Sequence, residues 1–330
     1  MVAITRATLA RQLQSSNTDT TKACAIGKRV TKQKKRTSKQ QRTGLSSSNA
    51  RAINSNDTTI SAPSQAYNDV VGKSNITDAL AYDCHWNPVG REYDLGRDGA
   101  FMGFNILIAQ FYGDCQFTDA AMQKPIDELK MKGFQVKHIK TEDECVKELA
   151  SNQYQVAWII SDSSIKNPNM IPSLANFHSN GGAIFLFADD SPWVRHASDF
   201  LQKKFGITVE GNYGGGNNMT YEENGHREKG HFGQHEIFTG IKHLFEGITI
   251  CHPVYSTSAS RTVFVPIATA SDGNTSIAVY DPPSNSTANE GRICLDCGFT
   301  KLYINWDSAG TARYIVNASC WLLRIENRFT

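Results

Sequence analysis

The sequence predicts an α/β protein built on a doubly wound, mostly parallel sheet that follows a long tail. Two observations carry this prediction. Between residues 99 and 206, short apolar runs alternate four times with amphipathic segments of helical length, which is the pattern of consecutive βαβ units. Residues 1–98, by contrast, show no apolar period that lasts more than a few positions.

The four apolar runs are expected to be neighbouring strands of one sheet. Three of them contain almost no polar residue, as strands covered by helices on both faces require. Four consecutive βα units favour parallel pairing, because each crossover helix returns the chain to the same edge of the sheet. The predicted strands span residues 104–111, 134–139, 155–161 and 183–188.

Local end signals accompany the predicted helices between these strands. The first helix begins at Thr118, and Thr141 with Glu144 has the spacing of a capping box at the start of the second. After the fourth strand, Ser191 and Pro192 fit the N-cap and the first helical position of another helix. The helix starts are therefore encoded locally.

Beyond residue 206 the pattern changes. Residues 207–244 are polar and Gly-rich, and a final helix is predicted from about 308 to 326. Between them lie shorter strand-like runs, and we expect these runs to extend the same sheet, some of them antiparallel. The predicted fold is therefore flavodoxin-like with added antiparallel strands. The runs cover residues 245–255, 262–270, 276–281 and 291–304.

The composition of residues 1–98 predicts a disordered tail before a domain at 99–330, because so few apolar side chains cannot offset the entropy of ordering. Residues 1–60 hold 12 Lys or Arg and 2 acids, a net charge of +10, which leaves −8 for the rest of a chain whose total is +2. The basic run from Lys28 to Arg42 is read as a solvated tail. The alternatives are a nuclear import signal or a weak contact with nucleic acid or an anionic surface.

No long apolar segment is present, either as a secretory signal or as a stretch of 18 or more residues. We therefore expect an intracellular protein, cytoplasmic or nuclear, with no membrane span. The eight cysteines are scattered, which predicts reduced thiols. Cys294 and Cys297 form one CxxC without a second CxxC or a nearby His pair, so a strand with one thiol on each face is expected rather than half a zinc site.

Polar residues follow several predicted strands, where open parallel sheets bind their ligands. An acidic pair at a helix N-terminus suits a cation or the hydroxyls of a sugar or polyol, although aspartates at strand ends also serve as ordinary caps. A Trp in the same turn can stack on a sugar face. The predicted ligand-binding residues are Asp114, Asp162, Asp189, Asp190, Trp193, His196 and His252.

Several cofactor chemistries lack their motifs. The first βα turn has a single Gly where dinucleotide binding needs G-x-G-x-x-G, and no GxxxxGK[ST] occurs. The spacing of His226, His231 and His235 would suit a metal site together with Glu236, but their polar segment fixes no geometry. We therefore predict neither a cofactor nor a metal site.

The second half of the chain resembles the class I glutamine amidotransferase-like superfamily, in its ThuA-like and related noncatalytic form. HEIFTGIKHLFEGITI at 235–250 is similar to that family's His-Pro-Ile-x-x-Gly-Ile…Phe-x-x-Gly stretch, with Glu236 in place of Pro. GRICLDCGF at 291–299 and WDSAGTARYIVNASCWLL at 306–323 resemble its closing strand and terminal helix. With the βα series, the similarity covers about residues 100–327.

The resemblance implies the scaffold without its catalytic residues. Catalytic members carry a nucleophilic Cys in a Gly-x-Cys-x-Gly elbow, activated by a His that a carboxylate orients. The corresponding turn here reads FADDSPW, and no Glu lies two positions after His252. We therefore expect a noncatalytic domain that binds a polar, carbohydrate-like ligand or a protein partner. The alternative is a hydrolase that uses Asp189, Asp190 or His252 for acid–base or metal chemistry.

Overall fold

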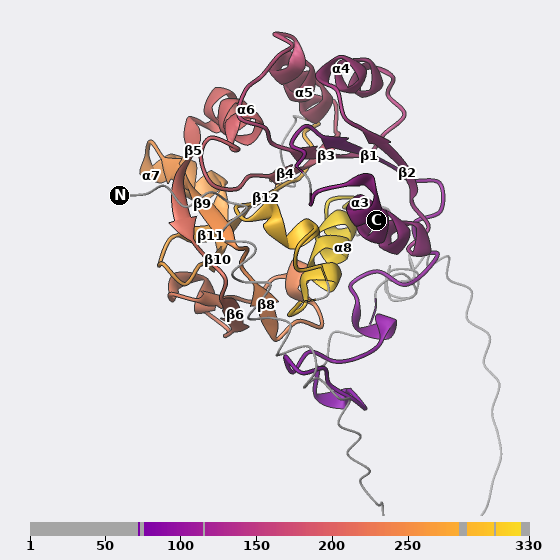
Figure 1. Cartoon of the computed structure of the whole chain (residues 1–330), viewed down its shortest axis with the longest axis vertical. Helices are drawn as coiled ribbons and strands as arrows, with labels where there is room; N and C mark the ends of the chain where they lie inside the picture. Colours follow the sequence, from indigo (N-terminus) through magenta and orange to yellow (C-terminus); the bar gives the residue numbers. More distant parts are fainter. Residues whose placement is uncertain (1–71, 73–75, 115, 284–288, 307, 325–330) are drawn as a thin grey trace, which may run out of the picture.

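The computed structural model describes residues 72, 76–114, 116–283, 289–306 and 308–324 (Figure 1). The basic run and the rest of the predicted tail before residue 76, apart from residue 72, lie outside the described residues. Within the described ranges, no helix combines the length and apolar character needed to cross a bilayer.

A ten-stranded sheet in the order β2-β1-β3-β4-β12-β11-β10-β7-β6-β8 forms the centre of the domain. Its first five strands are parallel to one another, and β11 and β10 continue it antiparallel. The predicted doubly wound sheet with added antiparallel strands is confirmed. The strands are β1 Asn105–Gln110, β2 Gln135–Ile139, β3 Val156–Ile160, β4 Ala183–Phe187, β6 Asn218–Tyr221, β7 His231–Phe232, β8 His243–Phe245, β10 Val265–Thr269, β11 Thr275–Tyr280 and β12 Ile293–Asp296.

Helices cover both faces of the parallel part, so each strand contributes side chains to two cores (Figure 1). In β1, Ile106 and Ile108 face one core while Leu107 and Ala109 face the other. The first core packs against α3 and α8, and the second against α4, α5 and α6. This double burial is the reason for the nearly continuous apolar runs. The helices are α3 Asp119–Met131, α4 Glu142–Ala150, α5 Met170–Ser179, α6 Arg195–Phe205, α7 Ser258–Val263 and α8 Thr311–Trp321.

Short 3₁₀ helices occupy several connections. They are η1 Ile76–Asp78, η2 Arg91–Tyr93, η3 Gly225–Arg227, η4 Glu236–Phe238 and η5 Phe299–Leu302.

One predicted strand does not join the large sheet. β9, Thr249–Tyr255, pairs antiparallel with β5, Ile207–Gly214, in a separate two-stranded sheet. The prediction that all late strands extend one sheet is wrong here, and the polar, Gly-rich segment begins with the strand β5. The reason is local: Gly206 ends α6 with a φ of 67°, and the chain turns directly into β5, where Ile207 and Val209 pack into the core.

The start of α6 also differs from its prediction. The helix begins at Arg195 with Val194 as its N-cap, not at Pro192 with Ser191. The backbone N–H of Ser191 instead donates to the carbonyl of Gly211 in β5, 2.7 Å away. This contact between distant segments directs Ser191 away from the capping position.

The ordered domain begins before the predicted boundary at residue 98. Tyr93 and Leu95 are 2% and 5% exposed. The carboxylate of Asp94 lies 2.7 Å from Lys132 in α3 and 2.7 Å from Arg313 in α8. The assignment of residues 76–98 to a disordered tail is therefore wrong, because their burial depends on partners distant in the sequence rather than on any periodic pattern.

The cysteines follow their predictions only in part. Cys84 is disulfide-bonded, so the expectation of reduced thiols is wrong for this residue. Cys294 and Cys297 are free and buried in the cores on opposite faces of the sheet, which confirms the expectation of a strand with one thiol on each side.

Candidate functional site

Two hollows lie at the carboxyl ends of the strands near the topological switch point. The chain leaves β1 toward β2 through α3 and leaves β3 toward β4 through α5, so the switch point lies between the neighbouring strands β1 and β3. Doubly wound sheets form their crevice at such a point. The larger hollow encloses about 370 Å³ and the smaller about 230 Å³. Phe111, directly after β1, and Lys140, directly after β2, line both hollows. We call this pair of hollows the crevice.

Asp114 lies at the rim of the larger hollow and also closes the turn that follows β1. Its Oδ2 accepts a hydrogen bond from the Tyr112 hydroxyl at 2.7 Å, and its Oδ1 accepts from the backbone N–H groups of Gln116 and Phe117 at 2.7 and 2.8 Å. The Tyr112 ring meets the Trp193 indole edge to face, with centroids 5.9 Å apart. The structure therefore connects Asp114 and Trp193 through Tyr112.

His196 is fully buried between two fixed partners. Its Nδ1 accepts a hydrogen bond from the backbone N–H of Asp162 at 3.1 Å, so its Nε2, 3.0 Å from Glu142 Oε1, carries the proton and donates. Burial lowers the pKa of His196, while the bond to Glu142 opposes that shift. Because both ring nitrogens are occupied, the imidazole positions its neighbours and is not available as a general base.

Glu142 is the organising residue of the smaller hollow, and the sequence analysis did not identify it. Its carboxylate accepts the backbone N–H groups of Lys166 and Asn167 in addition to the His196 ring. These bonds hold the loop after β3 so that Lys166 lines the hollow. Thr141 marks the start of α4, but a Glu in a first turn is usually solvated, so no sequence signal shows its burial.

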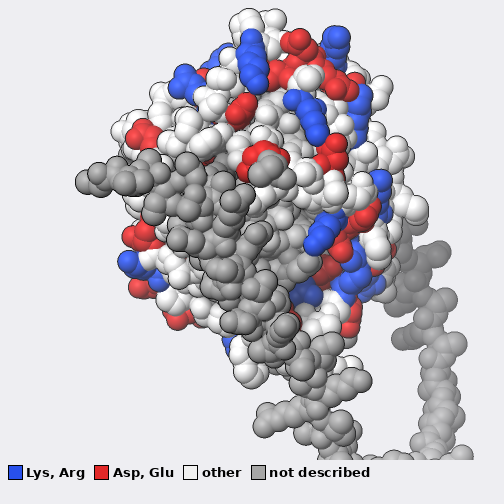
Figure 2. All heavy atoms as spheres, viewed as in Figure 1, with Lys and Arg blue, Asp and Glu red and all other residues white. Residues whose placement is uncertain are grey.

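The charges of the crevice are mixed. Lys140 forms an ion pair with Asp119, and Lys166 lies 3.5 Å from Asp162. On the face in Figure 2, lysines and arginines are likewise interspersed with acids over α4 and α5. The crevice thus offers both donors and acceptors around the half-buried Phe111 ring, without a field of one sign.

The acidic pair after β4 points into the protein. Asp189 is fully buried and accepts a hydrogen bond from the Thr249 hydroxyl, at 2.9 and 3.0 Å from its two oxygens. Asp190 is 5% exposed. Among the described residues, no group of three or more His, Cys, Asp or Glu side chains is arranged to hold a metal ion.

His252, His231 and His235, which the sequence analysis named as candidates, do not line the crevice. His252 is half-buried in β9, with its ring 5.2 Å from that of Tyr213. His231 lies 3.3 Å from Glu222, and the His235 ring packs against Trp321 at 5.1 Å. The structure therefore gathers Asp114, Asp162, Trp193 and His196 around the carboxyl ends of β1, β3 and β4, and places His252 in the small sheet.

Comparisons with known proteins identify similar folds. The chain matches no protein-family model and no curated protein. Among solved structures, the mmIFT52 N-terminal domain is similar at 11% identity, with 66% of this chain and 97% of that chain covered and a TM-score of 0.47. A thua-like protein from Bacteroides uniformis ATCC 8492 follows at 14% identity, 67% and 91% coverage and a TM-score of 0.37. A thua-like protein from Parabacteroides merdae ATCC 43184 is 12% identical, with 68% of this chain and 90% of that chain covered and a TM-score of 0.38.

Proposed function

We propose that this domain is a noncatalytic binding domain, with an amidotransferase-like scaffold, that holds a small polyhydroxylated ligand in the crevice. The observation that carries the proposal is the pair of adjoining hollows that share Phe111 and Lys140 at the switch point of the sheet. Hollows of this size at this position are the usual ligand sites of doubly wound folds.

The bonding of the predicted polar residues supports binding rather than catalysis. Asp114 closes a turn, Asp189 accepts the Thr249 hydroxyl, and both nitrogens of His196 are engaged. The turn after β4 holds no Cys. A general base needs a free lone pair within reach of the substrate, and neither Asp189 nor His196 offers one in the crevice.

The lining of the crevice favours hydroxyl groups over a charged ligand. Lys140 donates, and Asp114, Asp119 and Asp143 accept, so a ligand that both donates and accepts is satisfied. The Phe111 ring supplies an apolar wall on which the C–H face of a sugar or cyclitol can pack. A protein partner could use the same surface, and the experiment below distinguishes it from a small ligand.

Titration of the full chain with D-glucose, D-galactose and myo-inositol, followed by isothermal calorimetry and thermal shift, tests the proposal. Saturable binding of at least one of them is expected, with a raised apparent stability. Lys140→Ala removes a donor common to both hollows and should weaken binding about tenfold, since a hydrogen bond from a charged group contributes roughly 1.5–3 kcal/mol. Lys203→Ala, on the exposed side of α6, is the matched control and should bind normally.

Two results would contradict the proposal. One is the absence of a shift with every compound, which would favour a protein partner. The other is equal affinity of the Lys140→Ala variant and the unchanged protein.

The hydrolase alternative rests on His252. Its buried Nδ1 makes no hydrogen bond with any described residue, so this nitrogen retains a lone pair or a proton. Turnover of p-nitrophenyl glycosides or esters that His252→Gln abolishes would establish the alternative over the binding proposal. Absence of turnover by the unchanged protein would exclude it for these substrates.

A further inference from the structure

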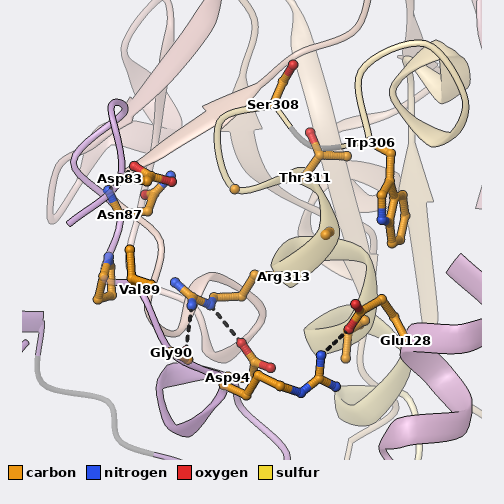
Figure 3. A pocket seen from close by; sticks show the side chains of 15 residues that line it. Asp83, Asn87, Val89, Gly90, Asp94, Glu128, Trp306, Ser308, Thr311 and Arg313 are labelled. Carbon is orange, nitrogen blue, oxygen red and sulfur yellow. Dashed lines mark hydrogen bonds and ion pairs between the residues drawn. The ribbon is translucent and has the colours of Figure 1, made fainter. Parts of the chain in front are cut away.

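A second cavity, which shares no residue with the crevice, lies between the N-terminal segment and the start of α8 (Figure 3). It encloses about 490 Å³. Asp83 and Val89 line it from the N-terminal segment, Glu128 from α3, and Trp306 and Thr311 from the region where α8 begins. We call it the α8 cavity.

The end of α8 that meets the cavity carries no side-chain cap. The N-cap residue is Gly310, with a φ of 70°, and it has no side chain to accept a hydrogen bond from the first turn. The N–H of Thr311 donates to the Ser308 carbonyl at 2.8 Å, but the next N–H groups of a first turn have no partner within the helix, and they carry its positive dipole end. Such an end stabilises an anion when one is close.

Thr311 gives independent evidence for a missing acceptor. It is fully buried and lines the cavity, yet its hydroxyl has no hydrogen-bond partner among the described residues. Arg91 also lines the cavity, and its buried Nη2 bonds to no residue that the structure describes, although its Nε and Nη1 donate to Asp98 and Glu128. A buried donor that makes no hydrogen bond is destabilising, so ligands that accept from these groups would be favoured.

Two of the three acids in the lining are neutralised by the protein itself. Asp94 is held by Arg313 and Lys132, each at 2.7 Å, and Glu128 is held by Arg91. Asp83 forms no ion pair with any described residue; its Oδ1 accepts the N–H groups of His85 and Asn87. The unused hydrogen-bonding capacity of the cavity is therefore chiefly that of donors.

We propose that the α8 cavity binds a small oxyanion, a carboxylate or phosphate group, through the first turn of α8 and the Thr311 hydroxyl. The apolar walls formed by Val89 and Trp306 accommodate the body of the molecule that bears this group. The proposal is independent of the ligand in the crevice.

Calorimetric titration of the full chain with inorganic phosphate and, separately, with acetate tests this proposal at constant ionic strength. Saturable binding of at least one anion is expected. Thr311→Val keeps the shape of the side chain and removes the hydroxyl, so affinity should fall about tenfold. The same change removes an unpaired buried hydroxyl, so resistance to urea should be equal or greater. Loss of affinity therefore cannot be ascribed to unfolding.

A second variant acts in the opposite direction. Asp83→Asn keeps the oxygen that closes its own turn but removes the one negative charge in the lining that the protein does not neutralise, so anion affinity should rise severalfold. Thr262→Val, on an exposed turn of α7, should leave anion binding unchanged. The absence of saturable binding of both anions, or wild-type affinity in Thr311→Val, would overturn the proposal.

Discussion

Lys301 Nζ lies 2.7 Å from Asp296 Oδ2, and both side chains are completely buried between β12 and α8. Asp296 also accepts the backbone N–H of Gly298 at 2.9 Å, and the Lys301 ammonium lies 5.3 Å from the centre of the Tyr314 ring. The pair is thus satisfied by several contacts beyond its own attraction.

Replacing Lys301 with Met should destabilise the domain by about 3–5 kcal/mol, because it leaves the Asp296 carboxylate buried without its cation. Urea denaturation at pH 7 measures the change. Asp296→Asn in the same chain should recover part of the loss. Arg195→Met, which breaks an exposed ion pair with Asp199 in α6, is the control and should change stability by less than about 1 kcal/mol. A small effect of Lys301→Met alone would contradict the role assigned to this pair.

His178 makes the domain sensitive to acid. Its side chain is fully buried, its Nε2 lies 2.9 Å from the Gly291 carbonyl, and burial lowers its pKa from 6.5 to about 4. The folded protein therefore disfavours the protonated ring, whereas the unfolded chain takes up that proton below pH 6.5. Stability from this residue is complete above pH 6.5 and is lost as the pH falls toward 4.

At pH 5 the free energy of unfolding should fall by about 2 kcal/mol because of His178, since each pH unit below the unfolded pKa of 6.5 contributes about 1.36 kcal/mol. His178→Gln keeps a donor for Gly291 but does not titrate, so the difference in unfolding free energy between pH 7.5 and pH 5 should shrink by that amount. Urea denaturation at the two pH values measures it. Equal pH dependence in the two proteins would show that His178 titrates normally in the fold.

The described free cysteines should resist alkylation in the folded state. Cys145, Cys251, Cys294 and Cys320 are buried, and burial raises the pKa of each thiol. Alkylation requires an accessible thiolate, and both conditions fail here. N-ethylmaleimide labelling at pH 7.5, mapped by peptide mass spectrometry, should leave these four unmodified until guanidinium chloride is added. Rapid labelling of any of them in the native protein would place that thiol at the surface.

Residues 76–98 should be required for stability. They supply both carboxylates that hold the fully buried Lys132, those of Asp94 and Asp98, and the Leu95 N–H that donates to Asn317 at 2.7 Å. A chain that begins at residue 76 is the reference in urea. In a chain that begins at residue 99, the free energy of unfolding should be at least about 3 kcal/mol lower, because the buried Lys132 ammonium loses both of its carboxylate partners. Equal stability of the two shortened chains would restore the boundary at residue 98.

Local sequence alone predicted the parallel core. The runs that form β1, β3 and β4 are apolar at nearly every position because both faces of these strands are covered. Such a run can be recognised in the sequence without knowing which segments pack beside it. Thr118 and Thr141 likewise cap the helices that they were expected to open, since a cap depends on bonds within a few residues.

Only the tertiary structure decided which polar residues meet. Glu142 bonds to His196, 54 positions away in the sequence, and Asp94 bonds to Arg313, 219 positions away. No local sequence pattern predicts either partner. The pairing of β5 with β9 and the cavity at α8 depend in the same way on segments that are distant in the chain. Apolar burial is encoded by each segment separately, whereas the partner of a buried charge or the wall of a cavity is fixed only when those segments pack together.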